Sequence, residues 1–297
     1  MIGISSRIRR RALLLSLTAF AASTSIAPSG PADATEPPTI VVASTTSTEN
    51  SGLFGWILPK FLAASGIRVH VVAVGTGQAI RIAERGDADV LLVHDRLSEE
   101  AFVRDGFGLE RHPIMYNEFV LLGPKDDPAG IGGTQDAAAA FAKIASQRAP
   151  FLSRGDDSGT HKAEMRLWSA AGVDPRPHSG TWYLETGSGM GQTLNTAVEK
   201  NAYVLSDDAS WRSFENKRDL GILVQGDTRL HNPYSVILVD PRRHPHVKAE
   251  AGATFVRWLL SAEGQRAIGS FERDGSPLFT PSVTPSAGTA NTGAGAP

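Results

Sequence analysis

The sequence predicts an α/β protein of two lobes, with a ligand cleft between the lobes and two crossing strands that join them. Short runs rich in Val, Leu and Ile alternate with segments of helical spacing, which is typical of parallel sheets covered by helices. Longer apolar strands at 114–122 and 233–239 enclose the middle of the chain and predict the two crossings. The loops after the strands are rich in Ser, Thr and Gly, and open α/β sheets bind ligands at that edge.

The same patterns predict the elements in chain order. The first lobe is expected to contain strands at 39–43, 68–74 and 89–93, with helices beginning near Leu53, Ala79 and Ser98. The second lobe is expected to contain helices at 137–146 and 161–171 and strands at 202–205 and 220–224, before helices at 246–260 and 262–271 return to the first lobe. The predicted boundaries are 35–116 for the first part of the first lobe, 117–235 for the second lobe, 236–276 for the return, and 277–297 for a disordered tail.

The first 34 residues have the features of a signal peptide. Four arginines at positions 7–11 precede an apolar run over 12–22, and an Ala-Asp-Ala motif ends at Ala34. The run is too short to span a bilayer securely. Export to the periplasm is therefore expected, with cleavage near Ala34.

Composition excludes several kinds of site and partner. The chain of 297 residues has a net charge of -2, which gives no reason to expect nucleic acid or an acidic membrane surface as partner. It contains no cysteine, so disulfides, thiolate metal sites, a cysteine nucleophile and a lipid-bearing N-terminal cysteine are excluded.

The stretch from residue 151 to residue 162 concentrates hydrogen-bond donors. An apolar run ends at Arg154, a Gly-Asp-Asp turn follows, and Ser158-Gly-Thr opens a segment of helical spacing. Helix N-termini carry unpaired N–H groups and partial positive charge, and a guanidinium adds a fork of charged donors, so this stretch suits an anion. A well-capped helix is the alternative, with Asp157 or Ser158 as N-cap and Arg154 paired to Asp156.

Two further loops carry hydroxyl groups. In the run Ser-Thr-Thr-Ser-Thr at 44–48, Thr46 and Glu49 have the spacing of a capping box, which leaves Thr45 as the freer donor. The Gly-Thr-Gly loop around Thr76 is either a ligand loop or a simple turn between a strand and a helix. A third loop, at 187–193, lacks the lysine of a phosphate-binding loop, so nucleotide hydrolysis is not expected.

Catalytic and metal sites are weakly supported. Ser158 and His161 with nearby aspartates could be a serine hydrolase, but no Gly-x-Ser-x-Gly elbow is present and both residues fall on one helix start. His244 and His246 flank a proline in a charged loop, where solvent exposure is expected instead of metal binding. Donors without an evident base or nucleophile predict a binder of a small oxyanion, with no catalytic residue and no protein-ligated metal.

A carboxylate acceptor distinguishes between oxyanions. Phosphate keeps a proton at neutral pH and benefits from an acceptor, whereas fully ionised sulfate, molybdate or tungstate is repelled by one. We expect Asp156 and Asp157 to orient Arg154 or to cap the helix, and to point away from the ligand.

Several motifs together resemble one family, the periplasmic tungstate-binding proteins of ABC import systems, within the type II solute-binding superfamily. The resemblance runs from about Ile40 to Phe271. It is carried by STTSTENSGL at 44–53, VGTGQA at 74–79, DVLLVH at 89–94, MYNEFV at 115–120, GPKDDPAGI at 123–131, SRGDDSGTHK at 153–162, WYLETG at 182–187 and NPY at 232–234. The family's helix after Tyr203-Val-Leu usually begins with a basic residue, where this chain has Asp207-Asp208.

The resemblance implies a type II periplasmic-binding-protein fold and a particular set of ligand contacts. The implied contacts are Thr45, Thr46, Thr76, Arg154, Ser158, Gly159 and Thr160. It further implies a monomer without a cofactor that captures tungstate or molybdate and delivers it to a membrane permease. A phosphate- or sulfate-binding receptor of the same superfamily is the alternative, and a serine hydrolase is a more distant one.

Overall fold

The computed structural model describes residues 37–283. The predicted signal peptide, 1–34, and positions 284–297 of the predicted tail lie outside these residues. Within the described part, no helix is both long and apolar enough to cross a bilayer.

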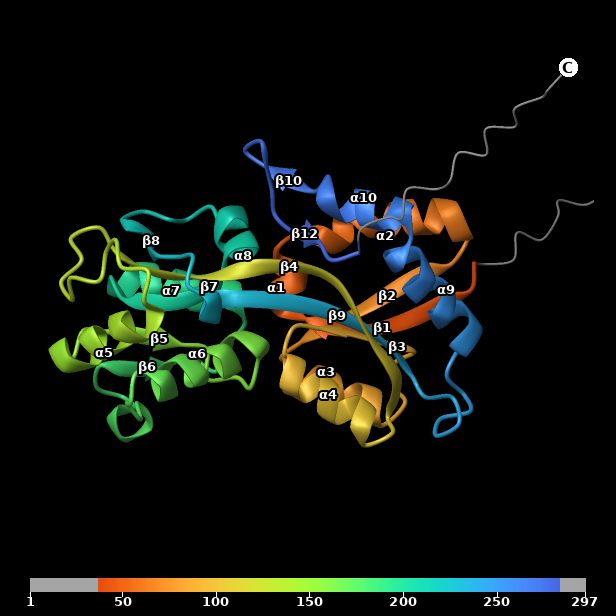
Figure 1. Cartoon of the computed structure of the whole chain (residues 1–297), viewed down its shortest axis with the longest axis horizontal. Coiled ribbons are helices and arrows are strands. Elements are labelled where there is room, and N and C mark those ends of the chain that lie inside the picture. The colour runs from red at the N-terminus through yellow and green to blue at the C-terminus, as the bar shows by residue number, and fades with distance from the viewer. Residues whose placement is uncertain (1–36, 284–297) are drawn as a thin grey trace, which may run out of the picture. The chain divides into compact units, whose positions relative to one another are not determined.

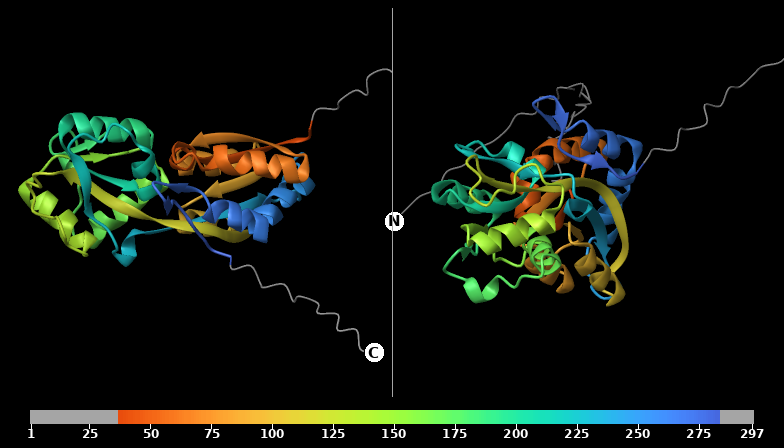
Figure 2. Two further views of the ribbon diagram at one scale, coloured as in Figure 1. Left: turned by 90° about the horizontal axis from the view of Figure 1, so that it is seen from above. Right: turned by 60° about the vertical axis from the view of Figure 1, so that its left-hand side comes forward.

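A mixed sheet of ten strands organises the described residues. Its strands follow the order β2-β1-β3-β9-β4-β7-β5-β6, while β8 and β12 also pair with β4. Strands β4 (Gly108–Pro124) and β9 (His231–Val239) pair antiparallel and are the two crossing strands. Figures 1 and 2 show them side by side, running from the strands of the first lobe to those of the second. The first crossing is thus longer than the predicted 114–122, because its polar start also pairs with β9.

The first lobe consists of elements before β4 and after β9. Before β4 lie β1 (Thr39–Thr45), α1 (Thr46–Asn50), α2 (Leu53–Ser65), β2 (Arg68–Val74), α3 (Thr76–Glu84), β3 (Val90–Val93) and α4 (Arg96–Arg104). After β9 lie α9 (Ala249–Leu260), α10 (Ala262–Gly269), the hairpin β10 (Glu272–Arg273) and β11 (Ser276–Pro277), and β12 (Thr280–Pro281). Strand β1 is parallel to β2 and β3, as the buried apolar runs predict.

The second lobe lies between the crossing strands in sequence. It contains α5 (Ala137–Gln147), β5 (Phe151–Ser153), α6 (Gly159–Ala170), η1 (Arg176–His178), β6 (Tyr183–Glu185), α7 (Met190–Lys200), β7 (Tyr203–Asp207), α8 (Asp208–Ser213), β8 (Leu220–Val224) and η2 (Thr228–Leu230). Strand β5 is parallel to both β6 and β7.

Each lobe has its own buried apolar core on both faces of its sheet. In the first lobe, Phe61 and Phe255 belong to one cluster and Phe102 to another. In the second lobe, Trp168 and Leu194 belong to two separate clusters. The sheet with helices on both faces is the arrangement expected for an open α/β fold.

The predicted tail was wrong in its first part. Leu278 and Phe279 are buried in the first-lobe core, and β12 pairs antiparallel with β4 at Met115 and Tyr116. Two adjacent apolar residues provide enough apolar surface to fix this segment, although its neighbours are Ser, Thr and Pro.

Candidate functional site

Arg154 is the centre of the candidate site. It follows β5 and is only 1% exposed. Its Nη1 donates to Ser47 Oγ at 3.0 Å, and its Nη2 donates to Thr46 Oγ1 at 2.9 Å. Because both hydroxyls belong to α1, this second-lobe guanidinium directly contacts the first lobe.

A second contact between the lobes lies beside Thr76. Its hydroxyl oxygen accepts from the backbone N–H of Gly159 at 2.7 Å. The backbone N–H of Gly77 donates to the carbonyl of Asp157 at 3.1 Å. Glycine is needed at this contact, because a Cβ at Gly75 would lie 2.9 Å from the Asp156 carbonyl oxygen.

The helix caps decide which hydroxyls are engaged. Ser158 is the N-cap of α6 and accepts from His161 N at 3.1 Å, one of the two predicted possibilities. The N-cap of α1 is Thr45, not Thr46, and it accepts from Thr48 N at 3.2 Å. The expectation that Thr46 caps this helix was therefore wrong, because the extended backbone of Thr45 starts the helix one residue sooner.

The two aspartates of the turn have different positions. Asp156 Oδ2 accepts from Arg154 at 2.5 Å, and its Oδ1 accepts from Ser158 N at 3.2 Å. Asp157 has a 55% exposed side chain that lies 3.7 Å from Arg81 and 3.6 Å from Lys162. Asp156 thus orients Arg154, as expected, and Asp157 belongs to the surface.

Several buried polar atoms near Arg154 meet no hydrogen-bond partner within residues 37–283. They are Arg154 Nε, Thr160 Oγ1, His94 Nε2 and Asp207 Oδ2. The imidazole of His94 lies against Gly159, where an added Cβ would come within 2.9 Å of the ring. Buried polar groups normally have partners, so a group of such atoms at one place indicates a ligand site.

His94 is a neutral acceptor at this site. Burial lowers the pKa of His94 to about 4, although the hydrogen bond with Asn232 opposes the shift. Its Nδ1 lies 2.9 Å from Asn232 Oδ1, an acceptor, so the proton of the neutral ring belongs on Nδ1. Nε2 then presents a lone pair.

Three residues beside the site were not among the predicted contacts: Ser47, His94 and Asp207, the last noted only as a departure from the family's pattern. His94 and Asp207 each stand where a strand of the sheet ends, one after β3 and the other closing β7. The rule that ligands bind at the carboxyl ends of strands could have singled out both. Ser47 lies within the hydroxyl run that had been noted, but its contact with Arg154 depends on how the lobes meet.

The geometry does not favour the hydrolase. Ser158 Oγ meets the backbone N–H of His161 instead of its imidazole, whose Nδ1 accepts from Asp157 N at 3.2 Å. Proton transfer from a serine needs the imidazole itself within hydrogen-bond reach. In the described residues no group of three or more His, Asp and Glu side chains could hold a metal ion. His244 and His246 contact backbone carbonyls of the α3 end.

The predicted loop at 187–193 opens α7 beside the site. Gly189 is the N-cap of α7, and a Cβ placed there would lie 3.4 Å from Thr46 Oγ1. Thr193 is buried and bonds to Thr186 at 2.8 Å, which ties the loop to its own helix.

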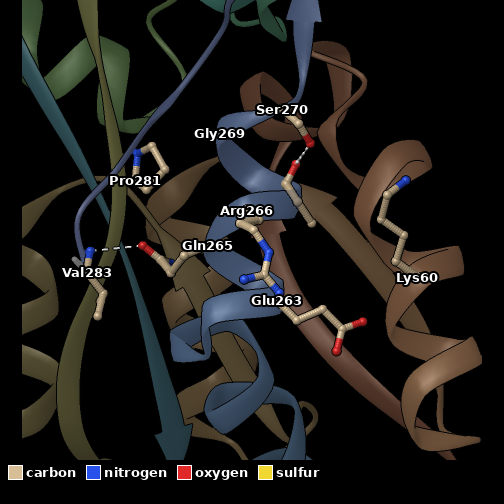
Figure 3. Close-up of a pocket in the computed structure, with 9 residues that line it drawn as sticks. Lys60, Glu263, Gln265, Arg266, Gly269, Ser270, Pro281 and Val283 are labelled. Atoms are coloured by element: carbon tan, nitrogen blue, oxygen red, sulfur yellow. Dashed lines mark hydrogen bonds between the residues drawn. The ribbon is translucent and has the colours of Figure 1, made fainter. Parts of the chain in front are cut away.

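A surface pocket of about 730 Å³ lies elsewhere in the first lobe, between α2, α10 and the last described residues. Figure 3 shows Lys60, Glu263 and Arg266 at this pocket, and Val283 N donating to Gln265 Oε1. It contains no residue of the candidate site.

The chain belongs to the PBP superfamily, whose domain matches residues 32–263. Its fold is the two-lobed type II periplasmic-binding-protein fold.

Within the superfamily, the chain is similar to proteins named for tungstate. The tungstate-binding protein TupA of Peptoclostridium acidaminophilum is 44% identical over 276 residues, which cover 91% of this chain and 95% of that protein. The structure of TupA from Desulfovibrio alaskensis G20 is 44% identical with a TM-score of 0.70, covering 83% of this chain and 100% of that one. The structure of the tungstate ABC transporter from Geobacter sulfurreducens is 45% identical with a TM-score of 0.71, covering 77% and 97%. This chain is a member of the family that contains these TupA proteins.

Proposed function

We propose that this protein is a periplasmic solute-binding protein that captures tungstate, or molybdate, and delivers it to an ABC import permease. The family membership supports the class of solute. The observation that carries the proposal is Arg154, a buried guanidinium between hydroxyl groups of the first lobe and the N-terminus of α6. Donors of that kind match an anion that only accepts hydrogen bonds.

We further propose which groups contact the oxyanion. They are Thr45, Thr46, Thr76, Arg154, Ser158, Gly159 and Thr160. Thr160 Oγ1 and Arg154 Nε are buried and meet no partner in the described residues, which supports both assignments. A hydrogen bond to a charged ligand contributes about 1.5–3 kcal/mol. Six or seven such bonds, less the cost of association, are enough for roughly nanomolar binding.

We also propose where the protein works and in what form. The signal peptide is removed near Ala34, and the mature protein works in the periplasm as a monomer that meets its permease. It has no catalytic residue and no cofactor. The first lobe extends over 35–116 with 236–276 and the following segment up to β12, and the second lobe over 117–235.

The phosphate- or sulfate-binding alternative is less well supported. Phosphate would benefit from a carboxylate that accepts its proton. Both oxygens of Asp156 already accept hydrogen bonds, from Arg154 and Ser158, and Asp157 is largely exposed, so the acceptors left for such a proton among the described residues of the site are Asp207 Oδ2 and His94 Nε2. The relatives named for tungstate favour the proton-free anion over phosphate.

The first test removes the guanidinium. Arg154→Ala should weaken tungstate binding by about 100-fold or more in calorimetry, since roughly 3 kcal/mol is lost with a buried partner of the anion. Arg176→Ala is the matched control, because Arg176 is exposed and pairs only with Asp174 in the described residues. Circular dichroism establishes that both variants fold. Unchanged affinity in folded Arg154→Ala would contradict the site.

Competition identifies the solute. Tungstate and molybdate should raise the melting temperature of the wild-type protein at micromolar concentration, whereas phosphate and sulfate should not displace them at large excess. A larger shift with phosphate would instead favour the alternative receptor.

A further inference from the structure

Asp207 is a buried carboxyl group beside the candidate site. It ends β7, caps α8 and has no exposed surface. Its Oδ1 accepts from the backbone N–H of Ser210 at 2.9 Å and from Asn117 Nδ2 at 3.3 Å. Its Oδ2 is also buried but meets no partner among residues 37–283. One oxygen of the carboxyl group is therefore fully used and the other is available.

Two asparagines of the crossing strands connect Asp207 to the first lobe. Asn232 Nδ2 donates to Asn117 Oδ1 at 2.7 Å, and Asn232 Oδ1 lies 2.9 Å from His94 Nδ1. Each amide accepts with its oxygen and donates with its nitrogen. In this series of hydrogen bonds from His94 through Asn232 and Asn117, every donated proton therefore points toward Asp207 Oδ1. A proton on the carboxyl group would consequently sit on Oδ2.

The charges at the site decide whether that proton is needed. Arg154 supplies one positive charge, which Asp156 already partners. If Asp207 were ionised, Arg154, Asp156 and Asp207 together would carry a net negative charge. A dianion bound among them and away from water would be strongly repelled. A neutral Asp207 removes that repulsion.

The other titratable groups near Asp207 do not replace this proton. They are Arg154 from the loop after β5, Tyr234 from β9 and His94 from the end of β3. Burial raises the pKa of Asp207, while the bonds from Ser210 and Asn117 and the charge of Arg154 oppose the shift. His94 is neutral, and burial raises the pKa of the Tyr234 hydroxyl, so neither compensates an ionised carboxylate.

We propose that Asp207 is protonated when the oxyanion is bound and donates to it from Oδ2. This inference rests on the proposed function. Asp207 then determines specificity, because it joins a set of donors that fits an anion carrying no proton. Where free Asp207 is ionised, binding takes up one proton from the solvent.

The test is calorimetry with sodium tungstate over the neutral and mildly alkaline range. In the wild-type protein, affinity should fall by about tenfold per pH unit once the pH exceeds the pKa of Asp207. Asp207→Asn keeps an acceptor for Ser210 and places an NH2 donor at the position of Oδ2. Its affinity for tungstate should therefore not change with pH over this range, and should exceed the wild-type affinity at alkaline pH. Calorimetry in buffers of different ionisation enthalpy should detect proton uptake on binding in the wild type and none in Asp207→Asn.

Asp208→Asn is the matched control. Asp208 is the next residue, lies partly exposed, and is 3.7 Å from Arg212. It should keep the wild-type slope. Other groups that titrate in this range, such as Glu164, are the same in all three proteins, so the difference isolates Asp207.

An Asp207→Asn variant that retains a slope seen in the wild type would overturn the inference. If the wild-type affinity does not change with pH, Asp207→Asn decides: equal affinity means a carboxyl group that is already protonated in the free protein, whereas tighter binding by the variant means an ionised carboxylate and overturns the inference. Weaker binding by Asp207→Asn over the whole range, including alkaline pH where the wild-type carboxyl group would be ionised, would likewise contradict donation from Oδ2. If the wild-type protein does not bind tungstate at all, the proposed function fails instead.

Discussion

At the scale of the residue, Thr160 has a hydroxyl that the fold itself does not use. Its Oγ1 is buried and has no partner in the described part of the chain. A buried hydroxyl without a partner costs stability, which is tolerated where a ligand supplies the missing acceptor.

Thr160→Val should therefore separate binding from stability. Tungstate affinity should fall by about 10- to 100-fold, from the loss of one hydrogen bond to a charged ligand, while the melting temperature stays equal or rises. Calorimetry and thermal unfolding without ligand measure the two effects. Thr196→Val is the control, since Thr196 lies partly exposed on α7 and donates to Gln192 O within its own helix. A large loss of stability would show that the hydroxyl serves the fold.

Residue contacts could be predicted from the sequence only where they are local. The pairing of Arg154 with Asp156 and the Ser158 cap each span two or three residues, so spacing alone pointed to them. Ser47 and Arg154 are 107 positions apart, and no local pattern reports such a contact. The Thr45 cap was missed because the capping-box spacing at Thr46 competed with it.

At the scale of the element, α6 carries a buried acid, Glu164, behind the end that we propose binds the anion. Glu164 Oε1 accepts from Trp168 Nε1 at 3.1 Å and from Tyr183 Oη at 2.8 Å. Burial raises the pKa of Glu164 to about 8, against these hydrogen bonds. The folded protein therefore holds a proton that the unfolded chain releases near the ordinary glutamate pKa of 4.5.

The raised pKa of Glu164 makes the stability of the protein depend on pH. Because the folded-state pKa is the higher one, Glu164 contributes stability that is complete below about 4.5 and is lost as pH rises through about 8. The melting temperature of the wild type should fall as the pH rises from about 4.5 to about 8, and that of Glu164→Gln should fall less over the same interval. Glu199→Gln, at an exposed pair with Arg218, should behave as wild type. Parallel melting curves for all three would contradict the buried acid.

Elements with strong periodicity were predicted well, and weak ones were not. Helix α6 begins at Gly159, close to the predicted 161, and β9 includes all of the predicted 233–239. The five-residue helix α1 has too few residues to show a period, so the sequence indicated only a polar loop there. Strand β12 has two residues and depends wholly on its partner β4.

At the scale of the whole molecule, glycines allow the lobes to meet. Gly75 has φ -66° and ψ 150°, a conformation that alanine adopts without strain. The obstacle to a side chain is the carbonyl of Asp156 in the other lobe, 2.9 Å from the added Cβ.

Gly75→Ala should consequently hinder closure without harming either lobe. Tungstate affinity should fall by about tenfold or more, from the ~1–3 kcal/mol typical of overpacking. Small-angle scattering should show a smaller ligand-induced decrease in radius than in the wild type. Gly55→Ala is the control, because a Cβ there meets no described atom within 4 Å. Unchanged affinity in Gly75→Ala would mean that ligand binding does not need this contact.

The pairing of β3 with β9 determines when the first lobe can be completed during synthesis. Val90 lies opposite Leu238, so the ribosome must add almost 150 residues before the sheet of that lobe gains its central neighbour. The second lobe is continuous in sequence and has its own core, and is available to fold first. Until β9 emerges, β3 has an apolar edge without its eventual partner, which is a hazard for aggregation.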